Sequence, residues 1–407
     1  MQLIKAHFYT RLKANALYVV LIVGVIVAIL LGSFLLLAHH QRLFQLRNEA
    51  ISNGMSNVNS SFFNYPKSTE GIEVVSNYWG AFRKVLIEDE EHQLKKVALL
   101  CAQKDSLYTS VYLEDYHSPL VLAGSASLEG KLELPDGYWK TGAVNGHYFT
   151  GKTQLKGIKP STKMPSIDSK WRDFTEGLLS GKAIEAKELM AQSRMNNSFI
   201  EPLQIIQTYG GNYINAELTG HFIVRDDVGI KVSANSELND IVIVAPQITI
   251  ESGFKGNIHC IANRIEIEKN VVLNYPSSLI AIEEEMKSTS NDDVFTDIKI
   301  GDNVLFNGFV IYLNHKSNLY ENRNIDITLG TNSKIVGDIY SQGYLELKGE
   351  VTGSIYTSYF MYDSGRGGKY INYLYNARVS FDQTIARYNG GLPLASNTEY
   401  IVASWLY

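Results

Sequence analysis

Hydrophobic residues are most concentrated near the N-terminus of the chain. Between Ala16 and Ala38 no residue is charged, and Leu, Val and Ile predominate. At a rise of about 1.5 Å per residue, a helix of this length crosses a hydrocarbon core of about 30 Å. The pattern therefore predicts a transmembrane helix at 16–38, through which the chain contacts the lipid bilayer.

A cleaved signal peptide is the alternative interpretation of this segment. Signal peptides have an apolar core of about 7–15 residues, followed by a cleavage site of the small-x-small type. Here the apolar run is longer and ends in Leu-Leu-Leu-Ala-His-His. The length therefore favours a retained, single-pass anchor.

The charges on either side of the span predict its orientation. Lys5, Arg11 and Lys13 precede the span, whereas Arg42 and Arg47 follow it. Because the side richer in Lys and Arg usually stays in the cytoplasm, we expect a cytoplasmic N-terminus at 1–15. The predicted location is the inner (cytoplasmic) membrane, with the soluble region facing the periplasm or exterior.

Helical periodicity continues beyond the span. Leu43, Leu46 and Ala50 extend an apolar stripe, and Asn53-Gly54 supplies a stop signal, so we predict a helical stalk at 39–54. The long N-terminal helix resembles that of type IV pilins and pseudopilins, although their processing motif is absent. That motif is a Gly-Phe before the apolar run, with a Glu five residues into it.

The segment at 55–118 mixes two periodicities. Two groups of apolar residues have helical spacing, and from Leu107 to Leu113 apolar and polar residues alternate as in a half-buried strand. The helical groups are Trp79, Phe82, Val85 and Leu86, and Leu94, Val97, Ala98 and Cys101. We predict a small α+β adaptor at 55–118 that separates the next domain from the bilayer.

A five-residue unit, apolar-x-Gly-x-apolar, recurs through the rest of the chain. The copies starting at 128 and 144 and those starting at 335 and 351 are each 16 residues apart, and those starting at 218 and 254 are 36 apart, or two steps of 18. The seven copies are 128–132, 144–148, 218–222, 254–258, 306–310, 335–339 and 351–355. Such regular spacing indicates a repeated structural unit.

Short alternating strands fill the gaps between these units. They lie at 241–244, 248–250, 265–267, 298–300, 325–329 and 345–347. Glycines at corners between short strands, with stacked coils burying a ladder of Ile, Leu and Val, are typical of a parallel β-helix. We predict a mainly β fold with a β-helix at 119–362, formed by about 119–157 and 203–362. An ordinary β-sandwich with glycine turns is the alternative.

Two segments interrupt the repeat, and a third follows it. Residues 159–197 contain a helical stretch beginning at Trp171, which we interpret as an inserted helix, and residues 283–293 form a polar, acidic excursion. From Asp363 a Gly-rich loop leads into apolar C-terminal residues. We expect the segment 363–407 to cap one end of the coil.

The stretch from Ile335 to Tyr356, IVGDIYSQGYLELKGEVTGSIY, carries a family resemblance. It resembles bactofilins, the polymer-forming bacterial cytoskeletal proteins whose small β-helical domain repeats a G-x-[IV]-[YH] unit. Looser similarity runs from about Gly220 to Ile282. The resemblance implies a β-helical coil, and bactofilins differ from this chain in lacking a long span with an outward domain.

Charge and cysteine content exclude several classes of function. The formal net charge is −5 over 407 residues, so the chain has no dense basic surface for nucleic acid. Cys101 and Cys260 are too few for a disulfide scaffold and lack a second thiol at metal-ligand spacing. Because Cys260 shares the strand face of Ile258, we interpret it as buried rather than reactive.

Motifs for nucleotide or metal binding are weak. Residues 146–153 formally match a phosphate-binding loop, but Gly157 and Pro160 follow too soon for the required helix. The nine histidines show no metal-binding spacing, and Asp292, Asp293 and Asp297 are better explained as loop acids than as calcium ligands. We nominate no catalytic, cofactor-binding or metal residue, and no cofactor.

No motif in the sequence points to catalytic chemistry. Polysaccharide lyases and hydrolases with this fold group charged residues on one face, and Lys299, Asp302, Asp326 and Asp338 are the residues that would do so, but nothing in their spacing singles them out. We predict a non-catalytic scaffold or assembly component of the bacterial cell envelope, whose partners are other envelope proteins or further copies of itself. Binding, or less readily processing, of peptidoglycan or polysaccharide is the alternative.

Overall fold

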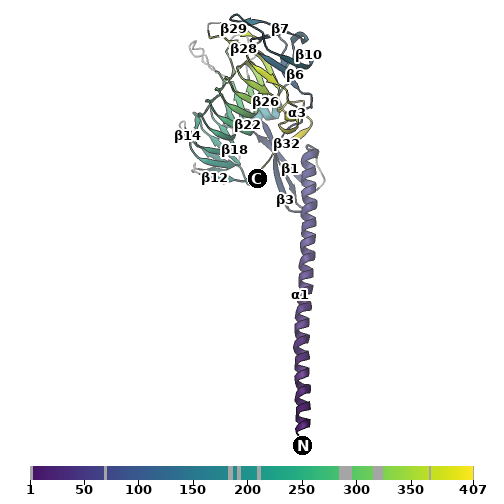
Figure 1. Ribbon diagram of the computed structural model, residues 1–407. Helices are drawn as coiled ribbons and strands as arrows, with labels where there is room; N and C mark the ends of the chain where they lie inside the picture. The colour runs from purple at the N-terminus through teal and green to yellow at the C-terminus, as the bar shows by residue number, and fades with distance from the viewer. Residues whose placement is uncertain are drawn as a thin grey trace.

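The computed structural model describes residues 3–67, 71–181, 187–189, 194–208, 212–283, 296–314, 324–365 and 368–406. The protein is mainly β, as predicted, with 50% of residues in strands and 19% in helices. A long N-terminal helix projects from a β-rich head, which we define as residues 72–406 (Figure 1).

Helix α1 (Leu3–Asn64) is one continuous helix of 62 residues, with the N-terminus at the end far from the head (Figure 1). Its side chains are exposed from residue 16 to residue 50. By length and composition α1 can span a membrane. Near its other end Val58 and Phe62 are buried against the head, so the apolar span and the head are joined by a single rigid element.

Four strands form an antiparallel sheet beside α1, in the order β1-β2-β3-β32. One face of the sheet packs on α1, and the other packs on the parallel strands described below. The four strands are β1 (Ile72–Trp79), β2 (Phe82–Asp89), β3 (Leu94–Ala102) and β32 (Tyr400–Leu406).

The helical faces expected at 79–86 and 94–101 are therefore wrong, since both segments are strands. Along β3, Val97 and Leu99 face the parallel strands, whereas Ala98 and Leu100 face α1. A strand buried on both faces is apolar almost throughout, so its period of two is hidden and helical spacing arises by coincidence.

The helix end expected at Asn53-Gly54 is also wrong, because α1 continues to Asn64. Gly54 is buried, and a Cβ on it would lie 2.6 Å from the Cβ of His92 and 2.7 Å from a methyl group of Leu94. This glycine allows α1 to approach the turn between β2 and β3, and it does not terminate the helix.

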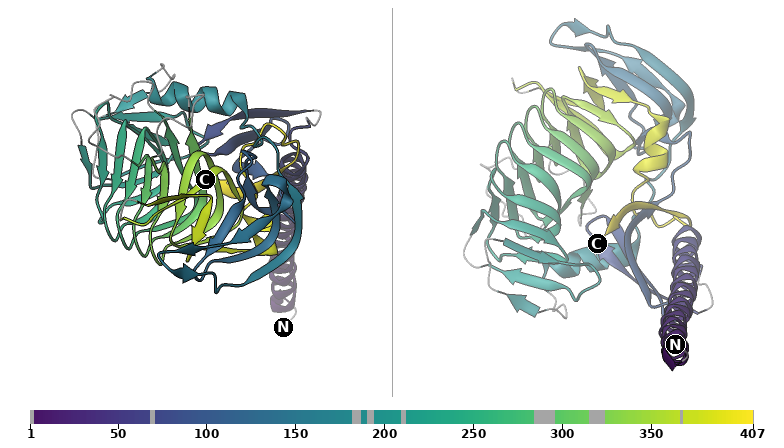
Figure 2. Two further views of the ribbon diagram at one scale, coloured as in Figure 1. Left: turned by 90° about the horizontal axis from the view of Figure 1, so that it is seen from above. Right: turned by 60° about the horizontal axis from the view of Figure 1, so that its bottom comes forward.

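The remaining long strands form a large parallel sheet whose strands fall into three ladders. In Figure 2 they appear as successive stacked turns of the chain. The first ladder contains β12 (Arg194–Asn197), β15 (Glu217–Gly220), the first parts of β18 (Glu237–Val244), β20 (Lys255–Ala262), β22 (Val272–Ile282), β24 (Leu305–Leu313) and β26 (Lys334–Leu347), then β27 (Glu350–Thr352), β31 (Arg378–Ser380) and β6 (Ser127–Leu134).

The second ladder uses the later parts of the same long strands. It contains β11 (Lys187–Leu189), β13 (Gln204–Gln207), β16 (Phe222–Arg225), then β18, β20, β22, β24 and β26, and finally β28 (Ile355–Asp363), β4 (Thr109–Leu113), β6 and β10 (Thr153–Pro160).

The third ladder contains β14 (Asn212–Ile214), β17 (Ile230–Val232), β19 (Gln247–Ile250), β21 (Arg264–Ile267), β23 (Ile298–Ile300), β25 (Ile327–Leu329) and the end of β26. A further parallel sheet contains β30 (Tyr373–Tyr375), β5 (Leu120–Ala123) and β7 (Trp139–Thr141).

The smaller elements complete the head. They are η1 (Pro135–Gly137), the hairpin strands β8 (Ala143–Val144) and β9 (His147–Tyr148), helix α2 (Ser169–Leu179), β29 (Lys369–Ile371), which pairs antiparallel with β28, and helix α3 (Gln383–Tyr388).

The stacking order departs from the order of the chain. Strand β4 follows β28 in the second ladder, and β6 and β10 follow β4. Residues 109–160 therefore extend the end of the stack that residues 355–380 begin. Strand β4 lies before the boundary predicted at 118 between an adaptor and the next domain. It nevertheless pairs with β28 and β6, so the two predicted domains share the large parallel sheet.

Six of the seven glycine units lie in the parallel strands. Gly308, Gly337 and Gly353 are stacked on one another with φ of 142°, 144° and 151°, a backbone region that other residues rarely adopt. The unit at 144–148 is the exception. There Asn145 and Gly146 form the turn of the β8–β9 hairpin, with φ of 50° and 83°.

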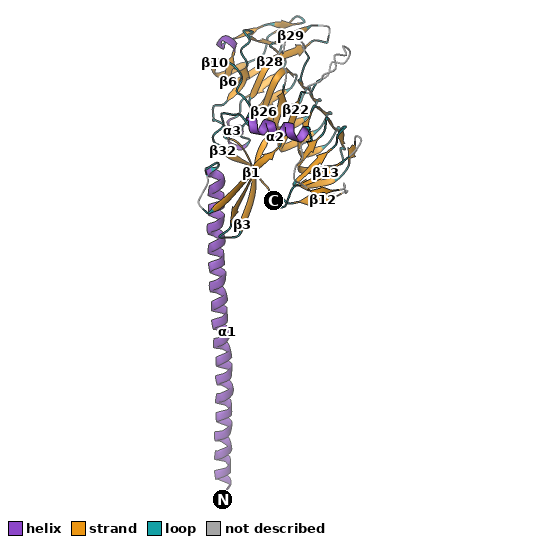
Figure 3. Ribbon diagram, turned by 180° about the vertical axis from the view of Figure 1, so that it is seen from behind, coloured by secondary structure: helices purple, strands orange, loops and turns teal. Residues whose placement is uncertain are grey.

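Three predictions from the sequence concerned two interruptions of the repeat and a C-terminal cap, and the structure compares differently with each. Within 159–197, helix α2 lies across the outside of the parallel strands, and the Trp171 indole donates to the Gly80 carbonyl at 2.9 Å (Figure 3). Residues 284–295 of the acidic excursion lie outside the described residues. The cap expected at 363–407 is wrong in two places, since β31 lies within the first ladder and β32 joins the antiparallel sheet.

Candidate functional site

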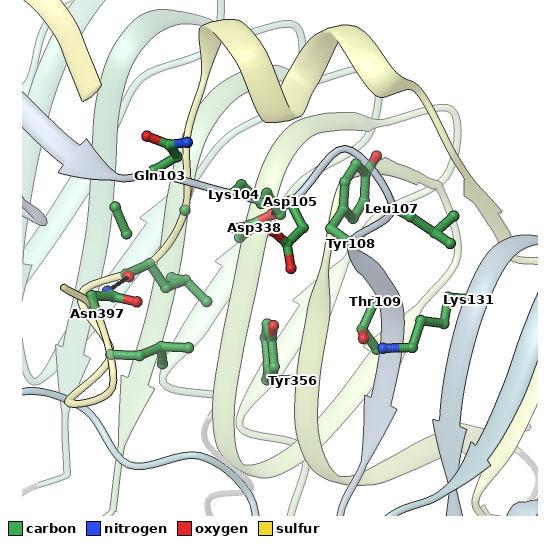
Figure 4. A pocket seen from close by; sticks show the side chains of 14 residues that line it. Gln103, Lys104, Asp105, Leu107, Tyr108, Thr109, Lys131, Asp338, Tyr356 and Asn397 are labelled. Carbon is green, nitrogen blue, oxygen red and sulfur yellow. Dashed lines mark hydrogen bonds and ion pairs between the residues drawn. The ribbon is translucent and has the colours of Figure 1, made fainter. Parts of the chain in front are cut away.

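A cavity of about 200 Å³ lies where the antiparallel sheet meets the parallel strands. Its walls come from the segment between β3 and β4, from β26 and β28, and from the chain before β32. Lys104, Tyr108, Asp338, Tyr356 and Asn397 are among the residues that line it (Figure 4). Three segments distant in sequence therefore contribute polar groups to one place.

A buried ion pair lies in the wall of this cavity. Lys104 Nζ lies 2.5 Å from Asp338 Oδ1, and their side chains are 8% and 2% exposed. Asp338 also accepts a hydrogen bond from the Ser354 backbone N–H at 2.8 Å. Burial lowers the pKa of Lys104, and the Asp338 carboxylate opposes this shift by stabilising the ammonium form.

Aromatic rings surround the pair. Lys104 Nζ lies 4.1 Å from the ring centroid of Tyr108, a cation–π contact. The Tyr108 hydroxyl donates to the Asp382 carbonyl at 3.0 Å and accepts from the Asp382 N–H at 3.1 Å. Burial raises the pKa of Tyr108 to about 12 and that of Tyr356 well above its usual range. Both phenols therefore stay protonated at neutral pH.

The geometry favours a fastening role for this pair over a chemical one. Lys104 is held by Asp338, and Lys131 at the cavity wall is held by Glu133 at 2.9 Å. Each of these lysines already forms an ion pair with a carboxylate, and both phenols are protonated at neutral pH, so the arrangement is better suited to holding segments together than to proton transfer or nucleophilic attack. The ion pair does connect the segment after β3 to β26.

Asp338 is the one member of the four-residue set from the sequence that lines this cavity. Lys299 is paired with Glu266 at 2.8 Å on an exposed surface, and Asp302 accepts from the Thr331 N–H and hydroxyl at 2.7 Å each. Asp326 accepts from the Tyr344 N–H at 2.7 Å. The four residues thus have separate local partners.

Cys260 and His259 are buried on opposite faces of one strand. Cys260 is fully buried, as expected, and burial raises its pKa far above the usual range. His259 points to the other side of the strand, where its Nδ1 lies 2.9 Å from Ser278 Oγ and burial lowers its pKa to about 3. Across the part of the chain that the structure describes, no group of three or more His, Cys, Asp and Glu is placed to hold a metal.

Residues of the other two motifs fall in strands and loops. The stretch 146–153 begins in the β8–β9 hairpin and leads into strand β10, so the helix that a phosphate-binding loop requires does not follow it. Asp297 is buried, and Asp292 and Asp293 lie outside the described residues.

A second polar cluster lies between the antiparallel sheet and the parallel strands. Lys84 Nζ on β2 lies 2.6 Å from His221 Nε2, and His221 Nδ1 lies 2.8 Å from the Glu201 carbonyl. The carbonyl can only accept, so this network assigns the proton to Nδ1 and leaves Nε2 to accept from Lys84. Burial lowers the pKa of Lys84 to about 8, and burial together with Lys84 lowers that of His221 to about 4.

His221 is expected to make the head less stable in acid. Its usual pKa is 6.5, so between pH 6.5 and about 4 the unfolded chain binds a proton that the folded chain does not. Stability from this group is present above pH 6.5 and is lost as the pH falls toward 4. The difference amounts to about 3 kcal/mol, at about 1.4 kcal/mol per pKa unit.

The measurement is the urea midpoint of the full-length protein in detergent at pH values from 7 to 4. His221→Asn removes the titrating group, so its midpoint should fall less over this range than that of the original protein. An equal fall of the urea midpoint between pH 7 and pH 4 in the two proteins would contradict the prediction.

Comparison with known proteins adds no assignment. The chain matches no family model, no curated protein and no solved structure. The function must therefore be inferred from the geometry of the head and its tether.

Proposed function

We propose that this protein is a membrane-anchored, non-catalytic scaffold of the bacterial cell envelope, whose head is a parallel β-helix. Three parallel ladders with glycines stacked at one corner support the coil, as does the resemblance of residues 335–356 to bactofilins. The head acts through contacts with other proteins. In this proposal α1 crosses the inner membrane at 16–38, and the head lies in the periplasm or outside the cell.

The observation that carries the proposal is the continuity of α1. The helix runs unbroken from the apolar span into the packed interface with the antiparallel sheet, where Val58, Phe62, Val85 and Leu100 are buried together. Residues 39–64 add about 39 Å of helix beyond the span, at about 1.5 Å per residue. A rigid spacer fixes the distance and direction of the head from the bilayer, as a scaffold requires and as a freely diffusing enzyme does not.

The test is cross-linking in intact cells with an amine-reactive cross-linker that does not cross the inner membrane. We expect discrete cross-linked species that contain this chain and other envelope proteins or further copies of it. A monofunctional form of the same reagent should label head lysines, which checks orientation separately.

Two outcomes would contradict different parts of this proposal. Labelling of the head only after the cells are lysed would overturn the orientation. Labelled but exclusively monomeric protein, together with retention on glycan, would overturn the scaffold role.

A cluster of tyrosines favours the second candidate function, binding of peptidoglycan or polysaccharide. The rings of Tyr362 and Tyr375 lie 4.7 Å apart, those of Tyr370 and Tyr373 lie 5.2 Å apart, and all four are partly exposed. Partly exposed aromatic rings can stack on sugar rings. Retention of the full-length protein on insoluble peptidoglycan, and its loss on Tyr370→Ala and Tyr375→Ala substitution, would support this alternative.

A further inference from the structure

Strand β10 forms an open edge at one end of the parallel strands. It pairs with β6, and among the described residues no other strand is in register with it. This end lies far from the N-terminus of α1, on the side of the head opposite the predicted membrane span (Figure 1). The apolar interior beneath β10 is covered by Trp139 and Phe149, whose rings make an edge contact at 6.0 Å. The interior is thus closed while the backbone edge remains open.

The direction of the hydrogen bonds shows which backbone groups are open. The Leu128 N–H donates to the Lys152 carbonyl, so Lys152 presents its backbone polar groups to β6. Successive residues of a strand present these groups to opposite sides, so the N–H and carbonyl of Thr153 face away from β6. Up to Leu155, before the register with β6 shifts between Leu155 and Gly157, unpaired groups of this kind are a template for an additional strand.

The segment 137–167, which contains β10, carries an unbalanced positive charge. From Gly137 to Ile167 the chain contains five lysines and no Asp or Glu, so the rest of the chain has a formal charge of −10 (−5 minus +5). The five lysines are exposed, and none is within ion-pair distance of a described carboxylate. They are Lys140, Lys152, Lys156, Lys159 and Lys163. Lys156 does lie over the Phe381 ring, and Lys140 over the Tyr138 ring.

Elsewhere in the ladders, some lysines pair with a glutamate on the strand in the adjacent turn. Lys299 pairs with Glu266 at 2.8 Å, and Lys334 pairs with Glu350 at 3.0 Å. In both cases the two residues are direct register partners on neighbouring strands. At the open end, Lys159 is the register partner of Glu133, but Glu133 is paired with Lys131. Lys299 and Lys334 thus have a glutamate on the neighbouring strand. The lysines of β10 have no such strand on their outer side among the described residues.

We propose that the open edge of β10 binds an extended acidic segment of a partner protein, which adds to the sheet as a further strand. This inference rests on the proposed scaffold role and names the chemistry of its partner. Backbone hydrogen bonds to residues such as Thr153 provide affinity, and carboxylates opposite Lys152 and Lys159 provide selectivity.

Charge also excludes two other occupants. A second copy presenting the same β10 edge would bring Lys152, Lys156 and Lys159 against the same three lysines, which repels. The headgroups of the protein's own membrane are beyond reach, because the helix spacer and the head separate β10 from the bilayer (Figure 1).

The experiment uses full-length protein in detergent micelles and a synthetic probe of eight residues, the length of β10. The probe is the capped peptide with four repeats of Glu-Val, labelled for fluorescence anisotropy. We expect saturable binding that weakens with salt, and binding about tenfold weaker or more to Lys152→Glu/Lys159→Glu. Lys170→Glu/Lys255→Glu is the matched control, because both lysines are exposed, Lys255 begins β20 and Lys170 lies in α2, which packs against β20 several strands from β10, and it should bind normally.

Two further probes separate strand addition from simple charge attraction. The same peptide N-methylated at alternate residues keeps its charge but loses donors along one edge, and it should bind at least about tenfold more weakly. Polygalacturonate, an anionic polysaccharide, tests the glycan alternative. Equal binding of the N-methylated peptide, or tight polygalacturonate binding that is lost in Lys152→Glu/Lys159→Glu, would overturn strand addition.

The two experiments distinguish a failure of strand addition at β10 from a failure of the scaffold role. If no peptide binds while cross-linking still finds protein neighbours, strand addition at β10 is wrong and the scaffold role survives. If peptide binds but cells yield only monomeric protein, the scaffold role is the part that is wrong.

Discussion

Replacing Gly353 with Val should destabilise the head by about 3 kcal/mol or more, and the same change at Gly337 should have a similar effect. Both glycines have φ above 140°, where a side chain is strained. A Cβ on Gly353 would also press into the backbone carbonyl of Gly337, and one on Gly337 into that of Gly308. Strain and overpacking each cost about 1–3 kcal/mol, and rigid backbone cannot move aside as a flexible side chain can.

Denaturation midpoints of the purified full-length protein measure this effect. Gly157→Val on the edge strand β10 is the control, because no atom lies within 4 Å of a Cβ built there and its φ is not in the positive region. Its midpoint should change little. Midpoints for the Gly337 and Gly353 variants that match the control would count heavily against a stacked glycine corner.

Lys104→Met should be nearly as damaging, with an expected loss of about 3–5 kcal/mol. The change leaves the Asp338 carboxylate, which is 2% exposed, buried without its cation. Removing one partner of a buried ion pair costs the desolvation of the other, which a single hydrogen bond from Ser354 does not offset. The segment joining β3 to β4 would also lose its fastening to β26.

The double variant Lys104→Met/Asp338→Asn tests the physical cause. It removes both charges, so it should be more stable than Lys104→Met alone. Lys95→Met is the control, because Lys95 and Glu88 form an exposed pair and solvent screens such pairs. A double variant less stable than either single variant would show that the two sites act through packing and not through charge.

The apolar span and the glycine units could be recognised in the sequence because each depends on local residues. A run without charge is apolar whatever surrounds it, and α1 indeed covers 16–38 in one helix. A glycine held at a positive φ is required by its own backbone, so Gly308, Gly337 and Gly353 marked the strand corners correctly. The mainly β composition of the head followed from the same alternation and spacing.

Glycine spacing alone could not separate different uses of the same residue. Gly146 occupies a hairpin turn, and Gly54 permits close helix packing, yet both match local signals for other structures. A glycine in a turn and a glycine at a close packing contact look alike in the sequence. They differ in whether another segment of the chain approaches the glycine in the folded protein.

The polar sites were the least predictable part. Lys104 and Asp338 are 234 residues apart, and Lys84 and His221 are 137 apart, so no short motif contains either pair. No pattern in the sequence marks Lys104 or Lys84 as a site residue. The unpaired lysines from Lys140 to Lys163 are visible as a charge run, but their meaning depends on β10 being an edge.

By itself, the sequence determined an apolar N-terminal helix, a mainly β head and glycine corners, because these follow from hydropathy, periodicity and backbone sterics over a few residues. The tertiary structure decided that β4, β6 and β10 stack after β28, that β32 returns to pair with β3, and that β2 and β3 are strands buried on both faces. These choices depend on which distant surfaces are complementary. Such contacts bury apolar surface away from water and pair charges between residues that are far apart in the sequence. Neither segment alone carries a hydrophobic period that would reveal its partner.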